Sequence, residues 1–471
     1  MIQKDRSIFG LKKGGPILVA LLVAVIYAAY SCLRHWHFGS SGFDLGIFDQ
    51  AIWHYSRFEA PQGTIRIIPN LLGDHFHPIL TLLAPLYWIW SSPYALLIFQ
   101  AFCFASAVLP IWLFSKKRLG SVPAYLIAIS YALFWGVQNA IAFDFHEIAL
   151  AVPLIAWSIY FIDQKKWRWF FGAILLLLLV KEDQALLVVF FGIYLLTQKQ
   201  YWRGLVTALS GTIWFLLATK VFIPYFAGNA GYTYWTYTQF GPDLASSLRS
   251  VITNPVHVFE VLFSSTTKLA TGWRLFYPFA LFSFFSPLLI LTIPLILERF
   301  LSNVPHFWLQ VFHYSATISP VLAMSAADGL SRLSRFVKID RFRRQLTLVL
   351  SLLILGLNVR LLPKLPLWRL TDPGFYRPSI SDIAGREALR FIPKESSVLA
   401  QDGIIPHLSQ RANIYTLQEG APLADYIITS SSVSPWPYKD EAEINLALTR
   451  ALSSDYEQIF SKDGWTVLKK N

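Results

Sequence analysis

The sequence predicts an all-α, polytopic membrane protein that carries a small soluble α/β domain at its C-terminal end. Apolar runs recur along the chain, several of them close to the roughly 20 residues that a helix needs to cross the hydrocarbon. Only 14% of the 471 residues are charged, whereas soluble domains carry about 25%. The runs are continuous rather than alternating, which favours helices over a closed barrel. They predict about 9–11 transmembrane helices.

The placement of basic residues supports this class. The net charge of +12 could indicate nucleic-acid binding, but the lysines and arginines stand in short clusters between apolar runs, which is the positive-inside pattern. We therefore expect a multi-pass cell-membrane protein that contacts the lipid bilayer and binds no nucleic acid. The basic residues before residue 16 predict a cytoplasmic N-terminus. Two cysteines, both in apolar runs, form no metal-binding pattern.

The first half of the chain alternates between spans and short connections. The first span covers residues 16–33, and the loop 34–78 after it is expected outside the cytoplasm. Residues 79–90 are too short to cross and predict a helix at the membrane interface. Further spans are expected at residues 94–115, 122–142, 148–162, 169–180, 185–197 and 205–222.

A long polar and aromatic loop, residues 224–273, opens the second half. Loops of this length inside a compact domain are usually functional or disordered, and this one is too aromatic for disorder. Two apolar segments, 269–285 and 288–301, are separated by Ser286–Pro287, where proline breaks a helix. Residues 308–330 and 346–362 are the last expected spans of a transmembrane domain covering residues 1–362.

The composition changes after residue 363. Short strand-like runs appear at residues 397–400, 413–417, 426–429 and 465–469, with a helical stretch at 441–452. This pattern predicts a small soluble α/β domain, residues 363–471, outside the cytoplasm.

The first outer loop is crowded with ionisable side chains that a simple tether would not need. Asp44 precedes a predicted helix, so it could cap that helix or act as a catalytic carboxylate, either as a general base or as a metal ligand. Asp49 lies five residues on, about 140° around an ideal helix, so the two carboxylates cannot share one face. One of them is expected to be structural. We take Asp44 as the catalytic candidate and Asp49 as a candidate for substrate binding.

The same loop ends in Gly73-Asp74-His75-Phe76-His77-Pro78. Carboxylate and imidazole groups at this spacing can bind a divalent cation, which would be the one cofactor expected. Histidines at a membrane interface without any metal are the alternative. Asp74, His75 and His77 are therefore candidate metal ligands.

A second ionisable cluster, Asp144-Phe145-His146-Glu147, stands at the outer end of one expected span. Ionisable groups at membrane depth are costly and usually functional. Alternatively, Glu147 simply begins the next helix, whose N-terminal dipole favours a carboxylate. Three ionisable groups in four residues exceed that need, so Asp144 and Glu147 are candidate catalytic residues and His146 a candidate for substrate binding.

A third cluster, Lys181-Glu182-Asp183, interrupts an otherwise apolar stretch. It could be an internally neutralised turn, or Lys181 could meet a phosphate with Glu182 assisting. His313, Tyr314 and Arg299 are weaker candidates for substrate binding, through contact with a phosphate. The charge pattern places all these clusters on one side of the membrane, which indicates a single site.

With these clusters, the chain resembles a family of bacterial and archaeal membrane proteins of unknown function. That family is grouped with the GT-C-fold glycosyltransferases. The resemblance extends over nearly the whole chain. The stretches that carry it are FDLGIFDQAIW, GDHFHPILTLLAPLY, FDFHEIALAVPL, LVKEDQALL, HYSATISPVLAMSAADGL, SVLAQDGIIPHLSQRANIY and ADYIITS.

The resemblance implies a GT-C-like transmembrane domain and an inverting transfer of sugar from a polyprenyl-phosphate donor to an acceptor that the sequence does not identify. Such enzymes resemble one another in placing one acidic residue in the first outer loop, here Asp44, and a second in the next, here Asp144 or Glu147. The Asp-Glu pair of mannosyl- and aminoarabinose-transferring relatives is absent, because Leu45 follows Asp44. The alternative function is a transporter or flippase of a lipid-linked glycan, which predicts charges near mid-span and often an inverted repeat.

Overall fold

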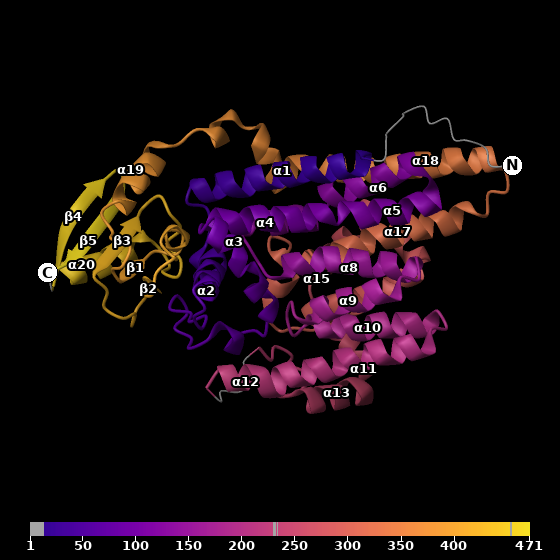
Figure 1. The fold of residues 1–471 in the computed structure, drawn as a ribbon, viewed down its shortest axis with the longest axis horizontal. Helices are drawn as coiled ribbons and strands as arrows, with labels where there is room; N and C mark the ends of the chain where they lie inside the picture. The colour runs from indigo at the N-terminus through magenta and orange to yellow at the C-terminus, as the bar shows by residue number, and fades with distance from the viewer. Residues whose placement is uncertain (1–13, 229–231, 233, 453–454) are drawn as a thin grey trace.

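The computed structural model of the chain describes residues 14–228, 232, 234–452 and 455–471. Long helices lie side by side along one direction, and a small β-sheet with its own helices lies at one end of them (Figure 1). This arrangement confirms the expected class, a helical membrane protein with a C-terminal α/β part. The basic residues that predict a cytoplasmic N-terminus precede residue 14 and lie outside the described residues, so the orientation of the chain stays a prediction.

Several helices match the expected spans. Among the described residues, four helical stretches are long and apolar enough to cross a membrane. They are α1 (Gly15–Trp36), α4 (Pro93–Ser106) continued by α5 (Val108–Leu119), α11 (Tyr201–Leu217) continued as far as α12 (Ile223–Phe226), and α18 (Asp340–Leu361). A fifth crossing results if α6 (Ser121–Leu133) and α7 (Trp135–Ala142), which meet at a 40° bend, act together.

Other apolar helices are shorter. α8 (Ile148–Asp163), α9 (Trp167–Leu178) and α10 (Gln184–Thr197) pack in sequence beside the longer helices (Figure 1). α17 (Ile318–Ser334) is buried along nearly its whole length and packs against α5, α6 and α8. The expected number of about 9–11 crossings depends on these shorter helices and stays a prediction.

The region between α12 and α17 differs from the expectation. In place of two continuous apolar segments, the chain forms α15 (Thr266–Phe276), three short 3-10 turns and α16 (Thr292–Phe300). Pro278 and Pro287 cannot donate a backbone hydrogen bond and clash with the preceding turn, and Ala280 and Leu281 adopt left-handed backbone angles. The aromatic loop before this region contains α13 (Leu244–Thr253) and α14 (Pro255–Leu262).

The C-terminal part contains a five-stranded sheet of order β2-β1-β3-β5-β4. Strands β1 (Val398–Ala400), β2 (Ile414–Thr416) and β3 (Tyr426–Ser430) are parallel, whereas β4 (Tyr456–Lys462) and β5 (Trp465–Lys470) pair antiparallel. The four expected strands and the helix α20 (Glu441–Leu452) are confirmed. The sequence pattern missed β4, whose residues are mostly exposed, and α19 (Ile380–Leu389), which precedes β1.

The first outer loop folds against this sheet. It contains a π-helical turn, η1 (Gly42–Gly46), and α2 (Ile47–Ser56); after it, η3 (Pro78–Leu83) and α3 (Ala84–Ile89) form the expected short helix. One hydrophobic cluster joins Leu45 and Ile52 of this loop to Ile405 and Trp465 of the C-terminal part. The C-terminal part therefore shares its core with the loop rather than hanging from a free linker.

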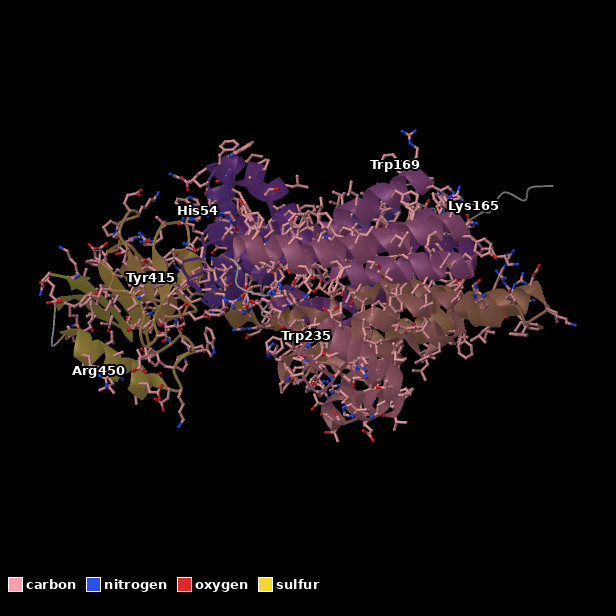
Figure 2. The ribbon with its side chains drawn as sticks, turned by 90° about the horizontal axis from the view of Figure 1, so that it is seen from below. His54, Lys165, Trp169, Trp235, Tyr415 and Arg450 are labelled. Atoms are coloured by element: carbon pink, nitrogen blue, oxygen red, sulfur yellow. The ribbon has the colours of Figure 1, made fainter. Side chains whose placement is uncertain are left out.

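The end of the helical bundle that lies away from the sheet carries basic residues. Lys165 lies at the end away from the sheet, whereas His54 lies beside the sheet (Figure 2). At the sheet-distal end, Arg118 pairs with Asp163 and Asp328, which joins the ends of α5, α8 and α17. The basic residues Arg118 and Lys165 thus lie at the end of the bundle away from the sheet (Figure 2).

Candidate functional site

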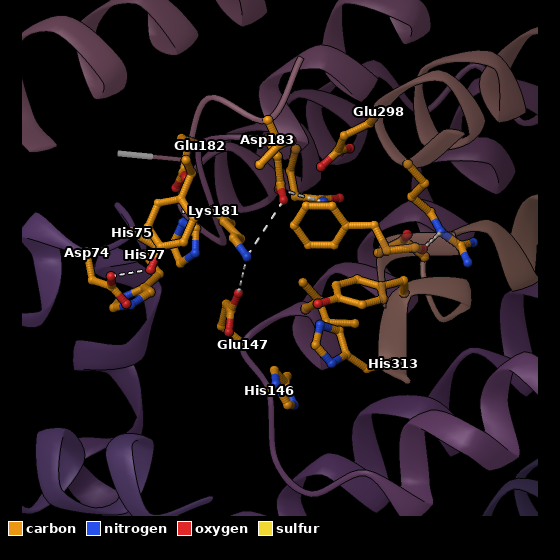
Figure 3. Close-up of a pocket in the computed structure, with 18 of the residues that line it drawn as sticks. Asp74, His75, His77, His146, Glu147, Lys181, Glu182, Asp183, Glu298 and His313 are labelled. Carbon is orange, nitrogen blue, oxygen red and sulfur yellow. Dashed lines mark hydrogen bonds and ion pairs between the residues drawn. The ribbon is translucent and has the colours of Figure 1, made fainter. Parts of the chain in front are cut away.

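A cavity of about 480 Å³ (Figure 3) is lined in part by η1, in the loop that packs against the C-terminal part. Its walls come from segments far apart in the sequence: η1, the turn between α7 and α8, the break between α9 and α10, part of the long aromatic loop, α16 and the turn before α17. The predicted site residues that line it are Asp44, Asp74, His75, His77, His146, Glu147, Lys181, Glu182, His313 and Tyr314. The structure therefore brings all three ionisable clusters together.

Asp44 reaches the cavity because the turn that carries it is capped by another residue. The hydroxyl of Ser41 accepts the backbone N–H of Phe43 at 3.1 Å. The N-cap position of α2 is Gly46, so the capping alternative for Asp44 is wrong. An oxygen of Asp44 instead lies 3.0 Å from Nε2 of His146. This leaves a carboxylate at the cavity wall, paired with an imidazole and partly open to a bound molecule.

His146 is itself held in place by a ring stack. Its imidazole stacks on that of His313 with ring centroids 3.7 Å apart. Burial disfavours the charged form of His146, but Asp44 outweighs this effect and raises the pKa of the imidazole. His146 therefore serves as a donor to Asp44, and its Nδ1 has no partner among the described residues.

Asp144 does not line the cavity. Its carboxylate accepts hydrogen bonds from Arg34 at 2.5 Å and from the backbone N–H of Ser41 at 2.9 Å. Its backbone has a φ of 88°, a left-handed angle that an aspartate tolerates better than most residues. Asp144 thus ties the end of α1 to the turn between α7 and α8. Its position gives no support to the catalytic role that we expected for it, and Glu147 is the acidic residue of this cluster that enters the cavity.

Asp49 is also outside the cavity. It is fully buried and accepts hydrogen bonds from the hydroxyl of Tyr87, from Ser409 at 2.6 Å and from Gln410 at 3.0 Å. A side chain enclosed in this way cannot contact a substrate in the cavity, so the structure does not support the expected substrate-binding role. Asp49 instead joins α2 to the C-terminal part.

Replacing Asp49 by alanine is expected to lower the free energy of unfolding by about 3 kcal/mol, because buried donors left without an acceptor are costly. Thermal unfolding in detergent, followed by loss of soluble protein, would measure the effect. Asp49→Asn is the matched control, since its amide oxygen can still accept. Equal melting temperatures for wild type and Asp49→Ala would contradict the structural role.

The same carboxylate predicts a dependence of stability on pH. Burial raises the pKa of Asp49 from 3.8 to about 6. The folded protein therefore keeps a proton that the unfolded chain releases, so this group lowers stability as the pH rises from about 4 to about 6. Asp49→Asn cannot ionise and should lack this decrease. Melting temperatures of both proteins across this range would test the difference, and parallel curves would contradict it.

Lys181 is the cation nearest the middle of the cavity (Figure 3). Its ammonium lies 3.3 Å from Glu147 and 3.8 Å from Asp183. Burial disfavours the charge of Glu147, but Lys181 and the neighbouring histidines outweigh this effect and lower its pKa to about 2. The internal charge pair of the first interpretation therefore forms and lines the cavity, whereas a contact between Lys181 and a phosphate stays a prediction.

The candidate metal ligands have different partners. Glu182 accepts from Nδ1 of His75 at 2.6 Å and from the backbone N–H of Phe76 at 3.0 Å, which anchors the Gly73–Pro78 segment. Asp74 accepts from Arg66 at 2.7 Å and from the hydroxyl of Tyr234. Within the described residues no group of three or more His, Cys, Asp and Glu side chains is arranged to hold a metal ion. A metal site at Asp74, His75 and His77 therefore stays a prediction.

Arg299 contributes a second cation. Its Nε donates to the backbone oxygen of Phe307 at 2.9 Å and its Nη1 to Ser315 at 3.0 Å. Nη2 is buried and has no partner among the described residues. Because a buried, unpaired guanidinium N–H is costly, this atom is a strong candidate to meet a bound anion. Sequence reasoning ranked Arg299 low because a single arginine in an apolar segment carries little signal.

Sequence reasoning also missed an aromatic wall. The long loop supplies Tyr232, Tyr234, Trp235 and Tyr237 to the cavity, and α16 supplies Glu298. Tyr234 stacks on His75 with ring centroids 4.0 Å apart. Aromatic faces beside carboxylates and hydroxyls suit a ligand with an apolar face and a polar rim, as a sugar ring has. The aromatic composition of the loop was the available signal, but it did not single out residues.

Comparison with known proteins identifies the fold. The profile of a family described as "Predicted membrane protein (DUF2079)" matches residues 34–467. No curated protein matches the chain. The solved structure of ArnT from Cupriavidus metallidurans bound to undecaprenyl phosphate is similar, with 14% identity, a TM-score of 0.54, and coverage of 97% of this chain and 98% of that chain. The apo form of the same protein has 14% identity and a TM-score of 0.53, with coverage of 97% of this chain and 97% of that chain.

An archaeal oligosaccharyltransferase, AglB from Archaeoglobus fulgidus, is also similar at 12% identity, with a TM-score of 0.42 and coverage of 97% of this chain and 74% of that chain. These proteins are GT-C-fold glycosyltransferases. At such identities the likeness shows the fold alone, and the ArnT structures carry it over nearly the full length of both chains.

Proposed function

This chain belongs to the DUF2079 family of predicted membrane proteins, and we propose that it is a glycosyltransferase that uses a polyprenyl-phosphate sugar. The acceptor binds on the extracytoplasmic face, which in this proposal is the end of the bundle that carries the sheet. The observation that carries the proposal is the cavity in which the Asp44–His146 pair and the two cations Lys181 and Arg299 lie together. The GT-C fold, seen in a neighbour bound to undecaprenyl phosphate, supports the class of donor.

The proposed reaction is a direct displacement. The hydroxyl of the acceptor gives its proton to Asp44 while its oxygen attacks the anomeric carbon of the donor. The bond from that carbon to the phosphate oxygen breaks, the electron pair leaves with the polyprenyl phosphate, and the configuration at the anomeric carbon inverts. The leaving phosphate needs charge stabilisation more than a proton.

The charged and aromatic residues named below have distinct roles in this reaction. His146 donates to Asp44 and orients the carboxylate, and its stack on His313 fixes the imidazole. Arg299 and Lys181 face the phosphate, Glu147 and Asp183 hold the ammonium of Lys181, and the aromatic wall binds the sugar. The proposal routes no step through a metal ion.

The test is turnover by the purified full chain in lipid nanodiscs. A panel of polyprenyl-phosphate sugars is offered together with a cell-envelope extract as the source of acceptor, and released polyprenyl phosphate is detected by mass spectrometry. We expect release from one or a few donors, and the productive donor names the sugar. Absence of both release and donor binding across the panel would overturn the proposal and favour the transporter or flippase.

A further inference from the structure

One segment of the C-terminal part, residues 401–411, contacts the turn that carries Asp44. The carboxylate of Asp402 accepts the backbone N–H of Phe43 at 3.1 Å, sharing this donor with the hydroxyl of Ser41. The backbone oxygen of Asp402 accepts the N–H of Gly42 at 3.0 Å. Both donors belong to η1. Asp402 is only 7% exposed and does not line the cavity, so it acts on the site through η1 rather than on a bound molecule.

The packing beside these bonds leaves η1 little freedom. The side chain of Ile405 lies so close to η1 that a Cβ added to Gly42 would come within 2.7 Å of it, and one added to Gly46 within 2.9 Å. Contacts this short do not occur between real side chains, so the glycines at these two positions are needed for the close approach. Ile405 therefore presses directly on both ends of the turn.

The same segment also holds the helix that follows. Ser409 and Gln410 donate to Asp49, and the amide of Gln50 donates to the backbone oxygen of Arg411 at 3.0 Å. Residues 42–50, with Asp44 among them, are thus attached to residues 402–411 at both ends.

The segment is in turn fixed to the sheet. Asp402 follows β1 almost directly. Its neighbour Gln401 donates to the backbone oxygens of Val433 at 2.9 Å and Ser434 at 2.7 Å, and accepts the N–H of Ser430 at 2.9 Å. The position of the sheet therefore determines the position of Asp402, and Asp402 determines that of η1.

From this chain of contacts we propose that Asp402 is a positioning residue for Asp44, so that the C-terminal part is a component of the active site and not a separate acceptor-binding module. The part of this inference that concerns catalysis by Asp44 rests on the proposed function. The role requires an acceptor atom for Phe43, not a charge. An asparagine at this position can supply that atom with its amide oxygen, whereas an alanine cannot.

The experiment compares Asp402→Ala and Asp402→Asn in the full chain in nanodiscs. Asp425→Ala is the matched control, because Asp425 accepts from Ser397 in the same C-terminal part but lies outside the contact with η1. The readouts are kcat and KM for the productive donor, and hydrogen exchange of peptides covering residues 41–47. The exchange readout needs no activity, so it separates failure of this inference from failure of the proposed function.

Asp402→Ala is expected to lower kcat by about 10- to 100-fold, since a small misplacement of a catalytic group has effects of this size, with KM within about twofold. Exchange of residues 41–47 should rise. Asp402→Asn should restore both readouts, and Asp425→Ala should match wild type. If Asp402→Ala does not fold, Gly46→Ala, which forces η1 away from Ile405, should give the same pattern. Unchanged exchange and kcat, or an Asp402→Asn as impaired as the alanine variant, would overturn the inference.

Discussion

Replacing Asp44 by asparagine is expected to lower the rate of sugar transfer by about 10²- to 10⁴-fold, the range that a general base contributes. Asparagine keeps the size of the side chain and an oxygen that can accept from His146, so the turn η1 should keep its shape. It cannot take up the proton of the acceptor hydroxyl. We therefore expect kcat to fall while the donor binds with an affinity within about threefold of wild type.

The measurement is release of polyprenyl phosphate under single-turnover conditions, with donor affinity measured separately. Asp49→Asn is the matched control, since Asp49 is a carboxylate of the same loop that the structure places outside the cavity. It should retain activity close to wild type. Equal losses in the two variants would show that the loop depends on charge in general, and full activity of Asp44→Asn would remove Asp44 as the base.

The contrast between Asp44 and Asp49 shows what sequence could and could not predict about the site. Helical periodicity separated the two carboxylates onto different faces, which is correct. Which face meets the cavity depends on Tyr87, Ser409 and Gln410, which surround Asp49. Two of these residues come from the C-terminal part, more than 350 residues away in sequence. A contact over this distance in sequence cannot be predicted from a local pattern.

The surroundings of Asp144 and Arg299 were also not predictable from local sequence. The position of Asp144 at the outer end of an expected span favours a catalytic role. In the structure its carboxylate instead forms an ion pair with Arg34 at the end of α1. Arg299 lies on a short helix that exists because prolines break an apolar segment. Once the segment is broken, α16 turns this arginine toward the cavity. Composition predicted the break but not the direction of the helix after it.

The helices and strands could be predicted from the sequence more fully than the site, because they depend mainly on local sequence patterns. The length of the apolar runs and the basic clusters between them predicted α1, α4 with α5, α11 and α18 to within about six residues at each end. Such runs form helices because every backbone group in hydrocarbon must be paired within its own helix. Short strand-like runs likewise predicted β1, β2, β3 and β5. The shared core between the first loop and the sheet was not predicted, because both sides of it are ordinary apolar residues.

The second large effect is expected at Arg299. Arg299→Gln should lower kcat by about 10²- to 10³-fold, the loss seen when one preorganised donor to a developing anion is removed. The guanidinium has an N–H without a partner among the described residues, whereas the ammonium of Lys181 is already paired with Glu147. Arg299 therefore has a donor free for the phosphate. Donor affinity should also fall, because the phosphate is charged before the reaction as well.

Two further variants separate this role from packing. Arg299 also donates to Ser315, so Ser315→Ala removes that bond while leaving the guanidinium in place. We expect this variant to retain about a fifth of wild-type activity, since one such bond contributes about 1 kcal/mol. Arg299→Lys keeps a charge but loses the planar fork, and it should recover part of the loss. If Arg299→Gln binds inorganic phosphate and donor as wild type does, the phosphate must lie at Lys181 instead, and the donor would then sit closer to Glu147 and the aromatic wall.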